Sequence, residues 1–162
     1  MSGISAQFQN GVAENAIKNT VTRARTMMLH AVIRWPEVKE QNLWPYALSH
    51  AAYLHNQTPN QQSGLSPVEI WMKTRSADHH HLQNLHVWGS PVYVLDPTLR
   101  DGSKLPKWNP RSRCGQYMGQ SLLHASMVGL ILNLQTGNIS LQYHVVHDNI
   151  PMVQNHQLNG PS

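Results

Sequence analysis

One carboxylate and two cations share an edge of the first helical stretch of this 162-residue chain. Apolar residues recur at intervals of three or four, which predicts an amphipathic helix over residues 12–34; the residues of this apolar stripe are Ile17, Val21, Ala24, Met28, Ala31 and Val32. At 100° per residue, Glu14, Lys18 and Arg25 fall on one edge of this helix, beside its apolar stripe. A carboxylate placed there could hold a metal ion while the two cations contact a nucleic-acid backbone.

Glu14 also has a simpler interpretation. If the helix begins near Asn10 or Gly11, Glu14 lies in its first turn, where a carboxylate interacts favourably with the helix dipole by roughly 0.3–1 kcal/mol. From the residues alone, both interpretations stay open.

A second candidate for nucleic-acid contact is a concentration of basic residues later in the chain. The net charge is +4, and five of the twelve Lys and Arg residues lie between residues 100 and 113, against the single acid Asp101. Such a segment suits phosphate binding because each neutralised phosphate releases counterions, although a solvated loop is the plain alternative. The five residues are Arg100, Lys104, Lys107, Arg111 and Arg113.

The histidines give no convincing metal site. Three successive histidines at residues 79–81 cannot face one ion from a helix or a strand, and no cysteine pair at zinc spacing accompanies them. His144 and His147 differ by an odd number, so we expect them to be separate surface residues on opposite sides of a strand. We expect His50 to be a packing or exposed residue of a helix. The single Cys114 excludes an internal disulfide.

The order of elements predicts an α+β fold. Three helices are expected, over residues 12–34, 40–57 and 66–73, followed by four or five short strands with a hairpin turn at 135–138. Ser66 is the expected N-cap of the third helix, with Glu69 three residues on. The residues of the second helix that we expect to face inward are Leu43, Ala47, His50/Ala51 and Leu54. So few short strands suit a small antiparallel β-barrel or meander. The strand-forming stretches are residues 85–96, 114–121, 126–134 and 138–146.

These elements suggest a division of the chain. We expect a helical domain over residues 1–76, a small β-rich domain with the basic loop over 77–150, and a disordered tail over 151–162. No apolar run approaches the roughly 18 residues that cross a bilayer, so we expect an intracellular protein with no membrane partner.

Several stretches together resemble the Pol polyproteins of copia-type retrotransposons. "QNGVAE", followed by a basic amphipathic helix, resembles the third-carboxylate segment of the DDE integrases. The resemblance covers about residues 4–149. The other matching stretches, in the family's order, are "WPYALSHAAYLHNQTP", "GLSPVEIW", "LHVWGSPVYVLDP", "PKWNPRSRCGQYMGQS" and "HVVHD".

The resemblance implies an RNase H-like integrase core, of which this chain would hold the C-terminal helical part and the β region that follows. In that family three acidic residues hold two Mg²⁺ ions for polynucleotidyl transfer. Glu14 matches the third acid, a catalytic metal ligand. The two aspartates would lie upstream, beyond the 13 residues that precede Glu14 here. We therefore expect no activity and no tight Mg²⁺ binding from this chain alone, in which Glu14 acts as a helix-end charge. Asn15 stands where the family typically has a basic residue.

By resemblance the partner is DNA and the location nuclear, with Lys18, Arg25 and the basic segment at residues 100–113 as nucleic-acid-binding residues. Two other hypotheses stay open: a non-catalytic nucleic-acid-binding module, and a host-adopted interaction protein. Because the central sheet of an integrase core is missing, we expect a loosely packed helical half whose exposed apolar stripe allows self-association.

Overall fold

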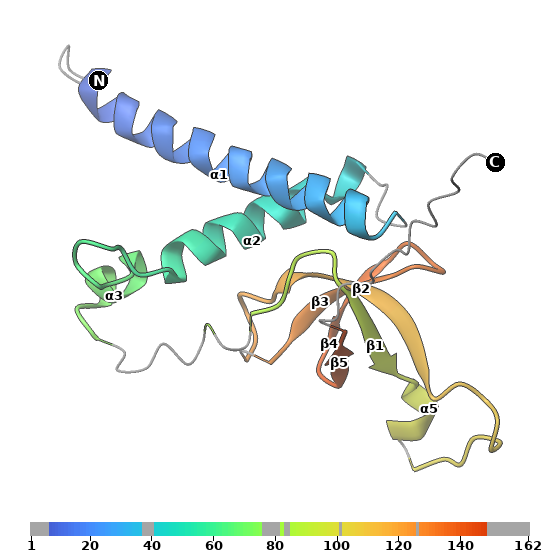
Figure 1. The fold of residues 1–162 in the computed structure, drawn as a ribbon. Coiled ribbons are helices and arrows are strands. Elements are labelled where there is room, and N and C mark those ends of the chain that lie inside the picture. The colour runs from blue at the N-terminus through green and yellow to red at the C-terminus, as the bar shows by residue number, and fades with distance from the viewer. Residues whose placement is uncertain are drawn as a thin grey trace, which may run out of the picture.

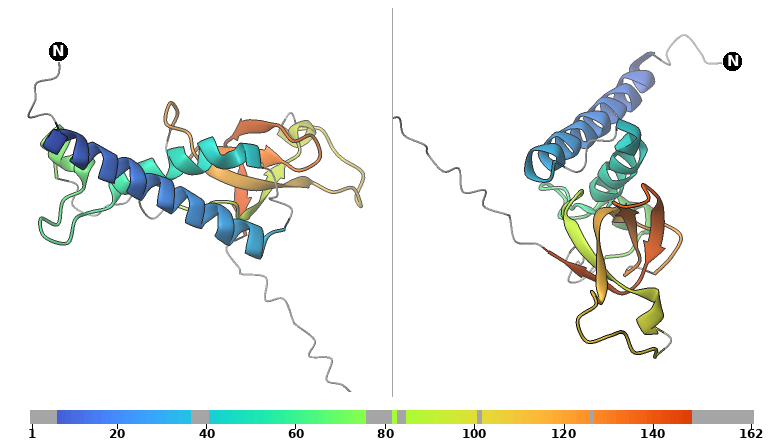
Figure 2. Two further views of the ribbon diagram at one scale, coloured as in Figure 1. Left: turned by 90° about the horizontal axis from the view of Figure 1, so that it is seen from above. Right: turned by 90° about the vertical axis from the view of Figure 1, so that its right-hand side faces the viewer.

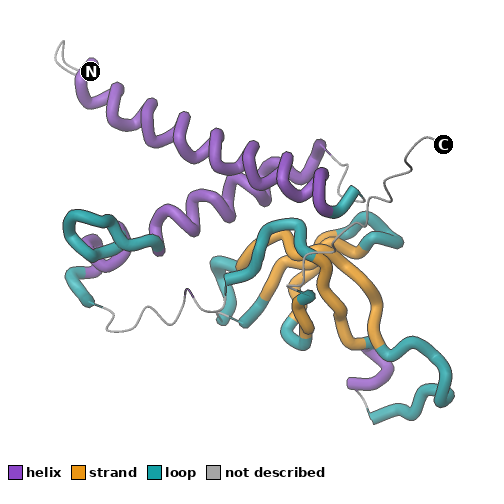
Figure 3. Tube along the Cα trace, viewed as in Figure 1, coloured by secondary structure: helices purple, strands orange, loops and turns teal. Residues whose placement is uncertain are grey.

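Two long helices lie over one face of a curved antiparallel sheet in the computed structural model of the protein (Figure 1). The structure describes residues 7–36, 41–75, 82, 85–100, 102–125 and 127–148. Helices and strands occupy separate parts of the molecule, except for α5 at the end of the sheet (Figure 3). The elements are α1 (Gln7–Arg34), the 3-10 turn η1 (Gln41–Leu43), α2 (Trp44–Gln57), α3 (Pro67–Met72), β1 (Pro91–Leu95), α5 (Pro97–Arg100), β2 (Ser112–Gln120), β3 (Gly129–Asn133), β4 (Ile139–Gln142) and β5 (Val145–His147).

The first helix is longer than the sequence predicts. It ends at Arg34 as expected, but it extends back to Gln7 instead of beginning near residue 12. Gly11, which suggested a helix start, lies inside α1 with open space around it. One glycine in a helix interior costs about 1 kcal/mol, which does not end a helix when its neighbours favour that conformation.

The two long helices pack through small side chains. Ala24 and Ala31 of α1, and Ala47 and Ala51 of α2, are at most 6% exposed and belong to one hydrophobic core. Such side chains let the helix axes approach closely, and the pattern on α2 follows the sequence prediction.

The buried strip of α1 is narrower than the predicted apolar stripe. Ile17, Val21 and Val32, which periodicity places on the inner side, are 65%, 50% and 41% exposed. The reason is that α2 is the neighbour of α1 and covers only the alanine side of the stripe. An apolar edge of α1 is therefore left in contact with solvent.

A single core joins the helices to the sheet. Trp88, just before β1, is 2% exposed and lies in the same cluster as Ala31 of α1 and Leu132 of β3. Its indole Nε1 donates a hydrogen bond to the carbonyl oxygen of Met118 in β2, at 3.0 Å. Figure 2 shows the helices stacked over one face of the sheet. The helical part thus has a packing partner downstream, and the domain boundary at residues 76 and 77 stays a prediction.

The predicted α+β class is confirmed, because the helices accompany a single antiparallel sheet of the meander type. Its strand order is β4-β3-β2-β1-β5, with antiparallel pairing throughout. Only residues 143–144 separate β4 from β5, which lie at opposite ends of this order, so the sheet has to curl until its edges approach. The predicted strand at 138–146 is accordingly divided in two. A second core fills the curl, and its residues are Val92, Val94, Tyr117 and Ile131.

Two local predictions from sequence are confirmed. Ser66 caps α3: its backbone N–H donates to Oε2 of Glu69 at 2.7 Å, and its side chain accepts from the Glu69 N–H. The β3–β4 hairpin turns at Gly137, whose φ of +71° lies in the left-handed region that glycine adopts readily.

Candidate nucleic-acid interface

The basic segment forms a long loop at the end of the β1–β2 hairpin. Residues 102–111 run between α5 and β2 and project away from the helices (Figure 1). At the base of this loop the backbone N–H of Asp96 donates to the carbonyl oxygen of Arg111 at 3.0 Å, and Leu95 pairs with Ser112. The paired strands hold both ends of the loop, so its tip is presented on a fixed support.

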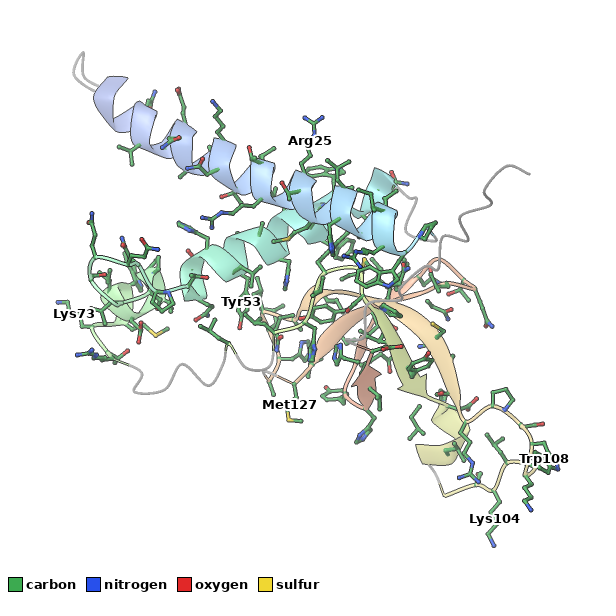
Figure 4. All side chains as sticks on the ribbon, in the orientation of Figure 1. Arg25, Tyr53, Lys73, Lys104, Trp108 and Met127 are labelled. Atoms are coloured by element: carbon green, nitrogen blue, oxygen red, sulfur yellow. The ribbon has the colours of Figure 1, made fainter. Side chains whose placement is uncertain are left out.

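An exposed tryptophan marks the tip of this loop. The N–H of Asn109 donates to the carbonyl oxygen of Pro106 at 3.0 Å, which closes a turn with Lys107 and Trp108 at its corner. Trp108 is 89% exposed, and Nζ of Lys107 lies 5.6 Å from the centre of its ring. Figure 4 shows Lys104 and Trp108 at the end of the loop, pointing away from the sheet.

Three of the five predicted basic residues surround this tip. Lys104, Lys107 and Arg111 are exposed, whereas Arg113 lies in β2, half-buried and paired with Val94. Arg100 ends α5, and its side chain is outside the described part of the structure. Between residues 102 and 113 the sequence contains no Asp or Glu, so the formal charge of the loop itself is positive.

The structure corrects the interpretation of Glu14 as a helix-end charge. Glu14 lies seven residues after Gln7, and the first turn of α1 contains no acidic residue. The dipole interaction falls off within the first turn, so it does not account for Glu14. The Glu14 side chain is exposed. Within the described residues there is no group of three His, Cys, Asp or Glu side chains that could hold a metal ion.

Lys18 and Arg25 lie on the same helix as Glu14, and both are exposed. Arg25 points away from α2 (Figure 4). The views in Figures 1 and 2 place the N-terminal half of α1, which contains Lys18, at one end of the molecule and the loop at 102–111 at the other. Arg25 lies in the C-terminal half of α1, and Figure 4 shows it on the side of that helix away from the sheet, whereas Lys104 lies at the end of the loop beyond the sheet. The two predicted groups of basic residues are therefore separate surfaces and not one site.

A histidine cluster that sequence reasoning missed lies inside the curled sheet. The rings of His86 and His147 are stacked, with centroids 3.3 Å apart, and Tyr117 meets His147 edge-on at 5.2 Å. His147 is thus a half-buried residue and not the surface residue expected. Burial, with a smaller contribution from His86, lowers the pKa of His147 to about 4. The pairing of β5 with β1 brings these residues together, and no local sequence signal predicts that pairing.

The adjoining cavity is small, about 150 Å³, and its lining combines this cluster with apolar side chains. The hydroxyl of Tyr117 donates to Oε1 of Gln120 at 3.3 Å, and burial raises the pKa of Tyr117. The stacked rings present their faces to each other, an arrangement that suits packing better than metal coordination. The histidine run at residues 79–81 and the tail at 151–162 lie outside the described residues.

His50 is a packing residue, which is one of the two roles expected for it from the sequence. It is 3% exposed and contacts Tyr117 edge-on, with ring centroids 5.8 Å apart. Burial lowers its pKa to about 4. The β2 backbone approaches so closely that a Cβ added to Gly119 would lie 3.2 Å from Nδ1 of His50.

None of the helices within the described ranges combines the length and the apolar character that crossing a bilayer requires.

Two curated proteins of Arabidopsis thaliana are similar to this chain. One is the retrovirus-related Pol polyprotein from transposon RE1, 30% identical over 140 residues, and the other is that from transposon RE2, 27% identical over 139 residues. Each comparison covers 86% of this chain, which spans about 8% of the length of these relatives. No protein-family model and no solved structure matches the chain. Over most of its length the chain is therefore similar to retrovirus-related Pol polyproteins of transposons, as its motifs predict.

Proposed function

We propose that this chain is an integrase-derived segment of a copia-type Pol polyprotein, and that it binds DNA through the loop at residues 102–111. The similarity to two transposon Pol polyproteins supports the origin. The order of the sequence motifs supports the integrase region within Pol. The binding role is supported by the exposed basic loop.

The observation that carries the binding role is the set of exposed cations in this loop. Lys104, Lys107 and Arg111 are exposed, and the loop contains no carboxylate that could neutralise them. Lysine and arginine side chains of this kind contact phosphates without reading sequence, and they position a protein on the nucleic acid. The binding that we expect is thus electrostatic and independent of base sequence.

Strand transfer would need a group of acidic residues that the described part of this chain does not bring together. Glu14 would be the third acid of the family's site, with Mg²⁺ held jointly by aspartates from elsewhere in a complete enzyme. A single exposed carboxylate does not supply the oxygen ligands that two Mg²⁺ ions require. The residues described here therefore do not fit a two-metal site by themselves, and no catalytic step follows from them.

The binding role is tested with two double variants that remove the same charge. Fluorescence anisotropy with a labelled DNA duplex at low salt compares Lys107→Ala/Arg111→Ala in the loop with Lys18→Ala/Arg25→Ala on α1. We expect the loop variant to bind about tenfold more weakly than the wild type, and the helix variant to bind nearly as well. Loss of binding in the helix variant alone would assign the interface to α1 instead.

A second candidate function, self-association, is favoured by the uncovered edge of α1. Besides Ile17, Val21 and Val32, the side chain of Leu29 is 56% exposed. Two copies could cover these edges against each other. Sedimentation equilibrium would then show a concentration-dependent dimer that Val21→Glu weakens. Ile70→Glu on α3, where Ile70 is also 56% exposed, is the matched control. A monomer at all concentrations would exclude this function.

A further inference from the structure

The loop at residues 102–111 combines its cations with a single large aromatic side chain. We infer that Trp108 stacks on an unpaired base, so that the loop prefers single strands or frayed ends of nucleic acid to an intact duplex. This inference rests on the proposed function and adds the form of nucleic acid that the loop recognises.

The position of Trp108 is the first step of the argument. The indole belongs to neither hydrophobic core and is 89% exposed. The turn closed between Pro106 and Asn109 holds its backbone at the outermost point of the loop. Proline at position 106 and again at 110 restricts the chain on both sides of this turn. An aromatic ring held this far from the protein is accessible to a planar partner.

The chemistry around Trp108 is the second step. Lys104 and Lys107 precede the indole, and Arg111 follows it, so cations flank the ring on both sides along the chain. Proteins that bind single-stranded nucleic acid combine the same two elements, a positive surface that follows the backbone and an aromatic ring on which a base stacks. In an intact duplex the faces of the bases are already stacked on one another. Away from the ends of a duplex, only an unpaired base offers a free face to Trp108.

A membrane surface is the other partner that an exposed Trp beside lysines can suit. The composition of the loop favours a base instead. Trp108 is the one large apolar side chain that is exposed among residues 102–111, and its neighbours Lys107 and Asn109 are polar. Insertion into lipid gains from several apolar side chains acting together, whereas stacking on a base needs only one ring.

The test compares a short labelled oligonucleotide as a single strand and as a fully paired duplex of the same sequence. Dissociation constants are measured by anisotropy for the full chain and for Trp108→Ala and Trp108→Phe. Trp71→Ala is the control, since Trp71 on α3 is 86% exposed and also lies close in sequence to a lysine. We expect Trp108→Ala to weaken single-strand binding about tenfold and to leave duplex binding nearly unchanged. Trp108→Phe keeps most of the affinity, and Trp71→Ala keeps all of it.

The outcomes separate this inference from the proposed function. If duplex binding depends on Lys107 and Arg111 while Trp108→Ala changes neither dissociation constant, the stacking inference is wrong and the proposed function stands. If the wild-type chain binds neither oligonucleotide, both are wrong. A third measurement, sedimentation of the chain with phosphatidylserine vesicles, tests for binding to a membrane surface. Vesicle binding that requires Trp108, without an effect on single-strand affinity, would assign the loop to a membrane surface and overturn the inference.

Discussion

Gly89 lies directly against Ala31 of α1: a Cβ built on Gly89 would fall 2.6 Å from the Cβ of Ala31. This contact joins the segment before β1 to the first helix, and it is possible only because residue 89 has no side chain. The φ of Gly89 is +81°, in the region that glycine adopts without strain.

Replacement of Gly89 by alanine is therefore predicted to be costly. The new methyl group collides with Ala31, and the left-handed backbone is strained, so we expect the free energy of unfolding to fall by about 3 kcal/mol. Gly64→Ala is the matched control, because Gly64 has a φ of +67° but no atom near the added Cβ. It should cost only about 1 kcal/mol. Equal losses in urea denaturation of the two variants would show that the Gly89–Ala31 contact does not exist.

Replacement of Trp88 tests whether the helices and the sheet unfold together. The sequence led us to expect a loosely packed helical half, whereas the core that contains both Trp88 and Ala31 predicts one unfolding transition for the helices and the sheet. Trp88→Ala should lower the free energy of unfolding by about 3–5 kcal/mol and shift the far-UV and near-UV circular dichroism transitions equally. Trp71→Ala, at an exposed site, should change it by less than about 0.5 kcal/mol. A wild-type helix signal that melts before the aromatic signal would contradict the shared core.

His50 makes the stability of the fold depend on pH. Its pKa is about 4 in the folded protein, below the ordinary value of 6.5, so between these values the unfolded chain binds more protons. The free energy of unfolding therefore falls as the pH drops from 6.5 to 4, by up to about 3 kcal/mol from His50. His147 acts in the same direction.

The measurement for His50 is urea denaturation at several pH values between 4 and 7. His50→Gln cannot take up this proton, so its stability should depend less steeply on pH, whatever its absolute stability. His144→Gln serves as the control, because His144 is exposed. An unchanged pH dependence in His50→Gln would show that His50 is not buried in its neutral form.

Glu14 is predicted to be dispensable in the isolated chain. Because its side chain is exposed on the surface of α1, Glu14→Ala should change the free energy of unfolding by less than about 0.5 kcal/mol. Incubation of the purified chain with DNA and Mg²⁺ should give no cleavage above background. Mg²⁺-dependent cleavage that disappears in Glu14→Ala would contradict the proposed function.

Sequence patterns predicted the local elements of this protein better than their contacts. The cap at Ser66, the inner face of α2 and the β3–β4 turn follow from short-range chemistry, and all three are confirmed. The exposure of Val21 was not predictable from periodicity, because periodicity identifies an apolar side of a helix but not how much of it a neighbour covers.

The candidate site shows the same limit. The basic residues of the loop were visible as a run in the sequence, while the separation of this loop from α1, the helix that contains Lys18 and Arg25, depends on the tertiary fold. The stacking of His86 on His147 was invisible, since it arises from the pairing of β5 with β1 across the whole β region. Long-range pairing carries no signature in the residues adjacent to each partner.

The central claim is that the loop at 102–111 neutralises phosphates, and its salt dependence tests this most directly. Binding of a DNA duplex is measured over a series of salt concentrations for the wild type and for Lys104→Ala/Lys107→Ala/Arg111→Ala. Each phosphate contact contributes about 0.9 to the slope of log K against log salt, so the triple variant should lose about three units of slope. A wild-type affinity that is independent of salt, or a variant with an unchanged slope, would contradict the proposal that this loop binds nucleic acid.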